Sequence, residues 1–149
     1  MLFTDTLARQ VMDQAPDAIM VADRAGVVCY WNESAERIFG FTAAAALGQT
    51  LDLIIPERHR QRHWDGYHQT MASGITKYGT KMLTVPALHC SNAQLTTEFS
   101  IVMLKDAQGQ PQGVAAIMRD ISAKRAEEKA LRDRLAALEA EQGAACQSP

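Results

Sequence analysis

Three segments with alternating apolar and polar residues follow one another in the second half of the chain, and they restrict the fold more than any other feature. Residues 77–88 (KYGTKMLTVPAL) and 94–104 (QLTTEFSIVML) are joined by a short connection that contains HCSN. A period of two is typical of strands with one buried face, and the short connection makes this pair a hairpin. After the turn DAQGQPQG, residues 114–121 (VAAIMRDI) are expected to form the third strand of an antiparallel meander.

The first half of the chain predicts a second hairpin, preceded by a helix. Residues 18–23 (AIMVAD) and 26–32 (GVVCYWN) are two short strands around the turn Asp-Arg-Ala-Gly. An amphipathic helix over residues 4–14 comes before them and ends at Pro16.

Further helices are expected between the two sets of strands. Asn32 or Ser34 caps a helix that Gly40 ends, and TAAAALG adds one or two helical turns. A longer helix is expected from Pro56 to the residue before Gly74.

The composition changes abruptly after residue 121. The sequence SAKRAEEKALRDRLAALEAEQ has no Gly or Pro and consists largely of strong helix formers. Leu131, Leu135 and Leu138 form an apolar stripe on it, which favours a homodimer-forming signalling helix over a solvated terminal helix. The predicted organisation is an N-terminal cap helix (1–15), one domain (16–121), this signalling helix (122–142) and a disordered tail (143–149).

Length and charge favour a single domain without nucleic-acid or membrane partners. The chain has 149 residues, 47% of them hydrophobic, which suits one packed core. Its net charge of −2 provides no general attraction to nucleic acid or to an anionic membrane. No run approaches the roughly 18 apolar residues of a membrane span. Asp5 and Asp13 interrupt the N-terminal apolar pattern, unlike in a signal peptide, so a cytoplasmic protein is expected.

The cysteines predict neither a zinc ribbon nor a disulfide framework. Cys29, Cys90 and Cys146 are odd in number and form no CxxC pair. Cys29 is expected to be a small buried residue of a strand, and Cys90 a turn residue.

The stretch LIIPERHRQRHWDGYH (53–68) holds three of the four histidines of the chain. Charged residues on a helix usually form a solvated face, and this is the alternative to a cofactor or metal site in this stretch. His59 and His63 are one helical turn apart, but no acidic or cysteine partner completes a zinc site. His68 and Trp64 have the same spacing and are expected to pack together.

The order of elements and several motifs resemble the PAS sensor family over roughly residues 8–123. APDAIMVADRAGVVCYWNESAERIFGFTAAAALGQ resembles the opening of that family, and RDISAKRAEEKAL resembles its close. The resemblance implies an α+β fold, in which a five-stranded antiparallel sheet carries helices over one face and encloses a pocket. It also implies a sensor or interaction module, and no Ser-His-Asp arrangement or phosphate-binding loop argues for an enzyme.

The stretch IIPERHRQRHWDGY resembles the haem-binding helix of oxygen-sensing PAS domains of the FixL type. On that resemblance, His63 is the proximal ligand of the iron and Tyr67 follows it on the helix. The distal position, an arginine in part of that group, falls on Met82 or Lys81. Neutral imidazole is a good iron ligand, and a proximal histidine is a common haem anchor.

The cofactor implied is haem b, held noncovalently because the chain has no CxxCH motif. Guanidinium groups near the iron ligand would suit the two haem propionates, and Arg58 and Arg62 are expected to serve them, with Arg60 close by. The pocket is expected to be lined by Leu53, Ile55, Tyr67, Met82, Phe99, Ile101 and Met118.

The expected function is therefore a haem-binding sensor of a diatomic gas or of redox state. The strand that ends at residues 119–121 would pass the change to the C-terminal helix, and from there to an effector domain or partner protein. Two alternatives remain: a cofactor-free dimerisation module, and a domain that binds flavin or a small metabolite. The blue-light chemistry of flavin-binding relatives needs a cysteine after the LGQ turn, where this chain has Thr50 and Leu51.

Overall fold

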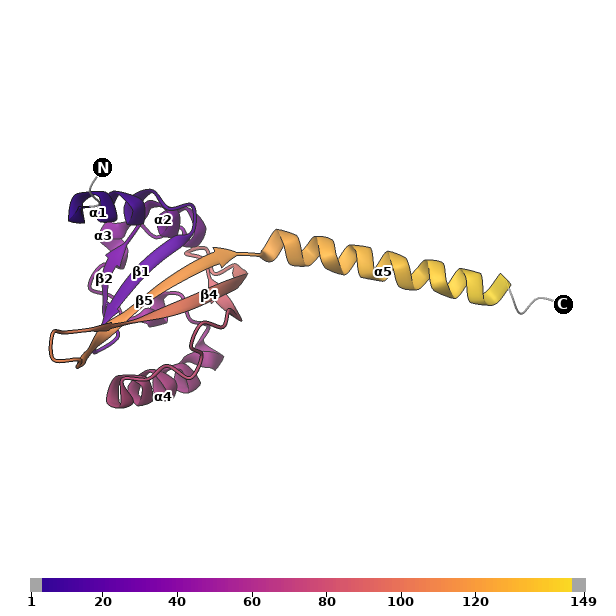
Figure 1. Ribbon diagram of the computed structural model, residues 1–149. Helices are drawn as coiled ribbons and strands as arrows, with labels where there is room; N and C mark the ends of the chain where they lie inside the picture. The colour runs from indigo at the N-terminus through magenta and orange to yellow at the C-terminus, as the bar shows by residue number, and fades with distance from the viewer. Residues whose placement is uncertain (1–3, 146–149) are drawn as a thin grey trace.

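The computed structural model describes residues 4–145, which build one five-stranded antiparallel sheet, short helices packed on it and a long helix that projects from it (Figure 1). The strand order across the sheet is β2-β1-β5-β4-β3. This is the predicted α+β architecture. In chain order the elements are α1 (Asp5–Gln14), β1 (Ala18–Asp23), β2 (Val28–Trp31), α2 (Glu33–Phe39), α3 (Ala43–Ala46), η1 (Leu51–Leu53), α4 (Glu57–Ser73), β3 (Leu83–Leu88), β4 (Gln94–Lys105), β5 (Pro111–Asp120) and α5 (Ser122–Ala145).

The buried face of the sheet follows directly from the alternation in the sequence. In β1, Ala18, Met20 and Ala22 are buried, while the residues between them are more exposed. Their neighbours in β5 include Met118 opposite Ala18 and Val114 opposite Ala22, and both are buried as well. Side chains of one strand alternate between the two faces, so these residues form one continuous apolar surface.

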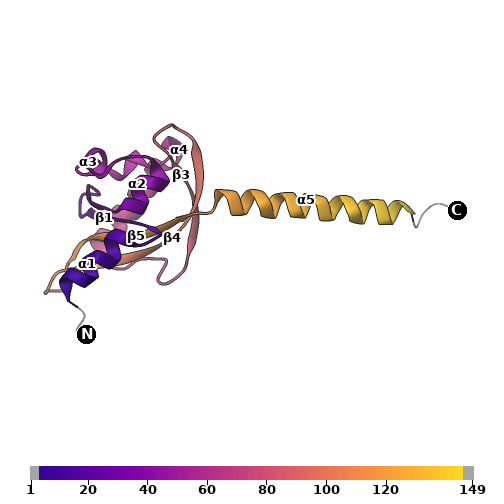
Figure 2. The same ribbon diagram turned by 90° about the horizontal axis from the view of Figure 1, so that it is seen from above.

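Helix α2 packs on this surface through buried Ala35 and Phe39, and its start and end are well defined. Asn32 is its N-cap, and the side-chain oxygen of Asn32 accepts a hydrogen bond from the backbone N–H of Ala35. Gly40, with φ of 77°, ends the helix and donates its N–H to the carbonyl of Glu36. Helix α1 lies beside α2 (Figure 1 and Figure 2).

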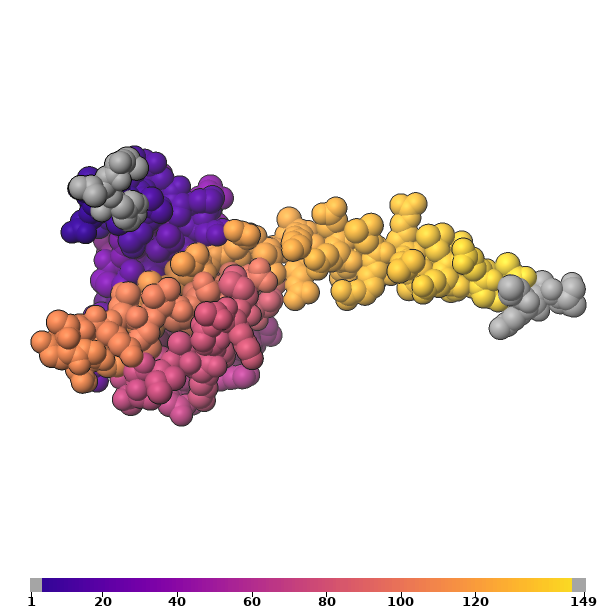
Figure 3. All heavy atoms as spheres, viewed as in Figure 1, coloured from indigo at the N-terminus to yellow at the C-terminus, as the bar shows by residue number. Residues whose placement is uncertain are grey.

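Helix α5 extends away from the body of the domain like a rod (Figure 3). Its root is fixed to the sheet, because the N–H of buried Ile121 donates to the carbonyl of Thr96 and the hydroxyl of Ser122 accepts from the N–H of Thr96. The helix continues to Ala145, three residues beyond the predicted end. Residues 146–149 of the predicted tail, including the third cysteine, lie outside the described residues.

Two local expectations are wrong. Residues 77–82 were expected to begin a strand, but β3 starts only at Leu83, because Gly79 takes φ of 53° and Lys81 donates its N–H to the carbonyl of Tyr78 in a turn. Cys29 is exposed rather than buried, since it is the residue of the edge strand β2 without a register partner, at the shift between the pairs Val21–Tyr30 and Ala22–Val28. Within residues 4–145 the structure contains no helix that could span a membrane.

Candidate functional site

The inner face of α4 carries His63, Tyr67 and Met71, which are spaced one helical turn apart. Tyr67 and Met71 are buried in the same core cluster as Met20 and Met118 of the sheet. His63 is half-buried above them. The helix therefore directs this histidine toward the sheet, and the solvated-surface interpretation does not hold for it.

Aromatic rings surround the imidazole of His63. Its ring centroid lies 5.0 Å from that of Trp64 and 5.7 Å from that of Tyr67. Trp64 in turn stacks on the ring of His68, with 5.9 Å between the two ring centroids, which confirms the predicted pair. Backbone passes close by, because a Cβ on Gly26 would lie 2.3 Å from the Trp64 ring, and Gly26 has φ of 80°.

Two hydrogen bonds hold this aromatic group in place. The hydroxyl of Tyr67 donates to the carbonyl of Asp23 at 2.5 Å, and the indole N–H of Trp64 donates to the carboxylate of Asp52 at 2.8 Å. A buried indole or phenol needs such a partner. Burial is the main reason why the pKa of Tyr67 is raised, so its hydroxyl stays protonated and remains a donor.

One ring nitrogen of His63 is left without a partner. Its Nδ1 is shielded from solvent and has no hydrogen-bond partner among the described residues. Burial lowers the pKa of His63 below the ordinary value of 6.5, although the carboxylate of Asp52 acts in the opposite direction. A neutral, half-buried imidazole with an unsatisfied nitrogen is chemically suited to ligate a metal or to hydrogen-bond a ligand.

Most of the predicted pocket residues lie around the same core. Met118 is buried, and the half-buried set consists of Leu53, Ile55, Phe99 and Ile101. Small side chains also face this region, since Ala18 and Ala22 are buried and Ala116 packs against them.

Met82 does not belong to this group. It is 53% exposed, because it lies in the turn-rich segment before β3 and not on a strand of the sheet.

The arginines are arranged differently from the expectation. Arg58 and Arg62 are both exposed, and Arg58 donates to the ring of His59 and to the side chain of Gln94. Arg60 instead turns toward the protein, where it donates to the carbonyls of Ile55 and Asp52. The 3.6-residue period explains this, since Arg58 and Arg62 lie about 140° and 100° from His63 around the helix.

The contact of Asp52 with Trp64 is the feature of the site that sequence reasoning missed. Asp52 accepts from Trp64, and its carboxylate lies 3.7 Å from the guanidinium of Arg60. The sequence did offer a signal for this contact. A partly buried indole N–H needs a hydrogen-bond acceptor, so a Trp next to an inward-facing histidine predicts an acceptor on a neighbouring element.

The lowered pKa of His63 predicts a pH dependence of stability. At mildly acidic pH the unfolded chain binds the proton more readily than the folded protein, so the free energy of unfolding should fall as pH drops below about 6.5. Urea unfolding at about pH 7.5 and about pH 5.5 measures this. His63→Gln should reduce the pH effect strongly, and His68→Gln should reduce it less, because burial and not His68 is the main cause of the lowered pKa of His63. Equal pH effects in wild type and His63→Gln would contradict the assignment.

Comparison with known proteins agrees with this architecture. A family model described as the PAS fold matches residues 12–126. An uncharacterised protein of Azorhizobium caulinodans is 30% identical over 136 residues, which are 91% of this chain and 18% of that protein. The sensor protein FixL of Bradyrhizobium diazoefficiens is 36% identical over 63 residues, which are 42% of this chain and 12% of FixL.

The chain thus spans less than a fifth of the length of these curated relatives. The crystal structure of the PAS domain of a protein from Colwellia psychrerythraea has a TM-score of 0.70 at 22% identity, covering 79% of this chain and 97% of that one. That likeness concerns the fold, and the family match covers most of the described residues. By its sequence and its architecture, the chain belongs to the PAS family.

Proposed function

We propose that this PAS domain is a sensor, rather than an enzyme, that holds haem b through His63 and signals through α5. The observation that carries the proposal is the inward-facing imidazole of His63, whose buried Nδ1 has no partner among residues 4–145. The stretch around it is the one that resembles the haem-binding helix of FixL-type domains, and FixL is also among the relatives of this chain.

The surroundings of His63 fit an apolar macrocycle. Buried alanines of the sheet belong to the same core as Tyr67 and Met71 of α4, and Phe99 and Ile101 pack against that core, so the side chains next to the helix are small or apolar. When bound, haem would supply an iron that takes up a diatomic gas or changes redox state. The residues of this chain would hold the ring, exclude water from it and keep the imidazole of His63 neutral.

The arginines of α4 differ in their freedom to reach a haem propionate. Arg60 is held by backbone carbonyls, whereas Arg58 and Arg62 are exposed and are able to swing toward a carboxylate at the surface. The segment before β3, where the resemblance places the distal position, has no arginine, so it would offer no guanidinium to a gas bound at such a haem.

Haem titration of the purified protein tests the proposal. Wild-type protein is expected to bind haem with an intense Soret band, and His63→Ala should lose that band. His59→Ala and His68→Ala are matched controls on the same helix and should keep it, because the ring of His59 lies one turn earlier and accepts a hydrogen bond from Arg58, and His68 is exposed. An identical spectrum with and without His63 would refute the assignment.

A second candidate function is a cofactor-free dimerisation module, favoured by the apolar stripe of α5. Leu131, Leu135 and Leu138 are 62%, 57% and 47% exposed, respectively. Three leucines exposed along one face of a helix form an apolar surface that a partner helix would cover. A protein that refuses haem yet forms a dimer would support this function instead.

Under either function the chain is expected to be a homodimer that passes its signal to an effector domain or partner protein. Replacing Leu131, Leu135 and Leu138 together by glutamine should raise the dimer dissociation constant by roughly tenfold or more, because their apolar surface is then lost from the interface. A matched control replaces Lys129 and Asp133, which pair with each other on the opposite face of the helix, by glutamine and asparagine. Sedimentation equilibrium measures both. An unchanged dimer in the leucine variant would show that α5 is not the main contact.

A further inference from the structure

A row of polar residues crosses the exposed face of the sheet where β5 leads into α5. Ala18 is paired with Met118, so Asp17 lies beside Arg119, and Arg119 is paired directly with Glu98 of β4. Glu98 in turn is paired with Thr84 of β3. One guanidinium therefore lies between two carboxylates that belong to different parts of the chain.

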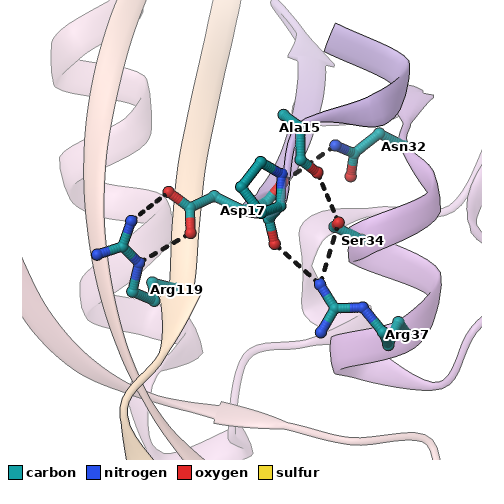
Figure 4. Close-up of polar contacts among 7 residues, drawn as sticks. Ala15, Asp17, Asn32, Ser34, Arg37 and Arg119 are labelled. Atoms are coloured by element: carbon teal, nitrogen blue, oxygen red, sulfur yellow. Dashed lines mark hydrogen bonds and ion pairs between the residues drawn. The ribbon is translucent and has the colours of Figure 1, made fainter. Parts of the chain in front are cut away.

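Arg119 is bound to only one of these carboxylates in the structure. Its Nε and Nη2 donate to the two oxygens of Asp17, each at 2.8 Å (Figure 4). Among the described residues, the carboxylate of Glu98 forms no ion pair with the guanidinium of Arg119 within an N–O distance of 4.0 Å, whereas the carboxylate of Asp17 does. The pKa of Arg119 is raised chiefly by Asp17 and to a smaller extent by Glu98, so both carboxylates attract the same cation.

Asp17 belongs to the N-terminal segment, which α2 holds through its side chains. The carbonyls of Ala15 and Pro16 accept hydrogen bonds from Ser34 at 2.6 Å and from Arg37 at 2.9 Å (Figure 4). A movement of α1 or α2 would therefore move Asp17 relative to the sheet.

Glu98 faces the root of α5 across a polar cavity of about 200 Å³. Lys124 and Arg125 of α5 line this cavity together with Glu98. Arg125 also pairs with Glu128 at 3.9 Å, and neither cation forms an ion pair with Glu98 among the described residues, so a free Glu98 carboxylate attracts the two cations across the cavity and in this way favours the observed position of the first turn of α5. The full lining consists of Thr84, Glu98, Ile121, Lys124, Arg125 and Glu128.

We propose that Arg119 is an exchangeable ion-pair partner that couples the N-terminal segment to α5. When Arg119 is bound to Asp17, Glu98 remains free to attract Lys124 and Arg125. When Asp17 moves away, Arg119 turns to Glu98 and neutralises it, and the first turn of α5 is released. This device does not depend on which ligand the domain binds, and it goes beyond the proposed function.

Amide hydrogen exchange in the first turn of α5 tests the device, with the N–H of Arg125, which bonds to the carbonyl of Ile121, as the main probe. Asp17→Asn should speed exchange there by roughly two- to fivefold, because Arg119 then captures Glu98. Glu98→Gln should speed it similarly. The double variant should exchange no faster than either single variant, because both act through the Glu98 carboxylate.

Arg119→Gln distinguishes two explanations: Arg119 exchanges its carboxylate partner, or its pair with Asp17 alone stabilises α5. This variant also breaks the pair with Asp17, but it leaves no cation to capture Glu98, so exchange in α5 should stay at the wild-type rate. Asp5→Asn, which removes an exposed carboxylate from the first turn of α1, should also leave it unchanged. The proposal fails if Arg119→Gln speeds exchange as much as Asp17→Asn does, or if the effects of Asp17→Asn and Glu98→Gln multiply in the double variant.

Discussion

Replacing Asn32 with alanine is expected to lower the free energy of unfolding by about 3 kcal/mol. The side chain is 2% exposed. Its amide donates to the carbonyls of Met12 and Asp17, and its oxygen accepts from the N–H groups of Ile19 and Ala35. Alanine would leave these four backbone groups without their partner and would also remove the N-cap of α2.

Urea unfolding followed by circular dichroism measures this loss. Gln69→Ala is the matched control, because it removes an exposed amide from a helix and should change stability by less than about 0.5 kcal/mol. Asn32→Asp keeps the accepting oxygen but loses the donating amide, so its loss should remain large. A loss of unfolding free energy below about 1 kcal/mol for Asn32→Ala would mean that the four hydrogen bonds of its side chain contribute little to stability.

Phe39→Ala is expected to cost about 4 kcal/mol of unfolding free energy. Phe39 is fully buried at the end of α2, and its ring centroid lies 5.5 Å from that of Trp31. Removing the ring leaves a cavity between α2 and the sheet that the surrounding strands cannot close. The half-buried Phe41 provides the comparison, and Phe41→Ala should cost less than half as much. Equal losses of unfolding free energy in the two variants would contradict the central position of Phe39 in the core.

Much of the fold could be predicted because its signals are local. The strand at residues 18–23, the cap at Asn32 and the helix stops at Gly40 and Gly74 each depend on a few neighbouring residues. Their backbone preferences agree with the final packing, so sequence patterns were sufficient for these elements.

The segment at residues 77–82 shows where a local pattern fails. Its alternation resembles that of a strand, but Gly79 and the turn at Tyr78 stop it from pairing with β4. Met82 consequently stays exposed, and its predicted role in the pocket was lost with the strand. Alternation alone does not show whether a neighbouring strand is available for pairing.

The candidate site was predictable only in part for a similar reason. The inward direction of His63 follows from its helical spacing to Tyr67, which is local information. The contact between Trp64 and Asp52 and the pair of Arg119 with Asp17 join separate elements, the latter across 102 positions of sequence. Such contacts depend on strand order and register, which the sequence pattern did not specify.

The most direct test of the central claim is rescue of a His63→Gly variant by free imidazole. If His63 holds haem through its ring, the glycine variant should bind haem weakly and without the wild-type spectrum, and added imidazole should restore the histidine-ligated Soret band. His68→Gly, treated in the same way, should show the wild-type spectrum before imidazole is added. A His63→Gly variant whose haem spectrum already equals that of the wild type, or a wild-type protein that binds no haem, would contradict the account.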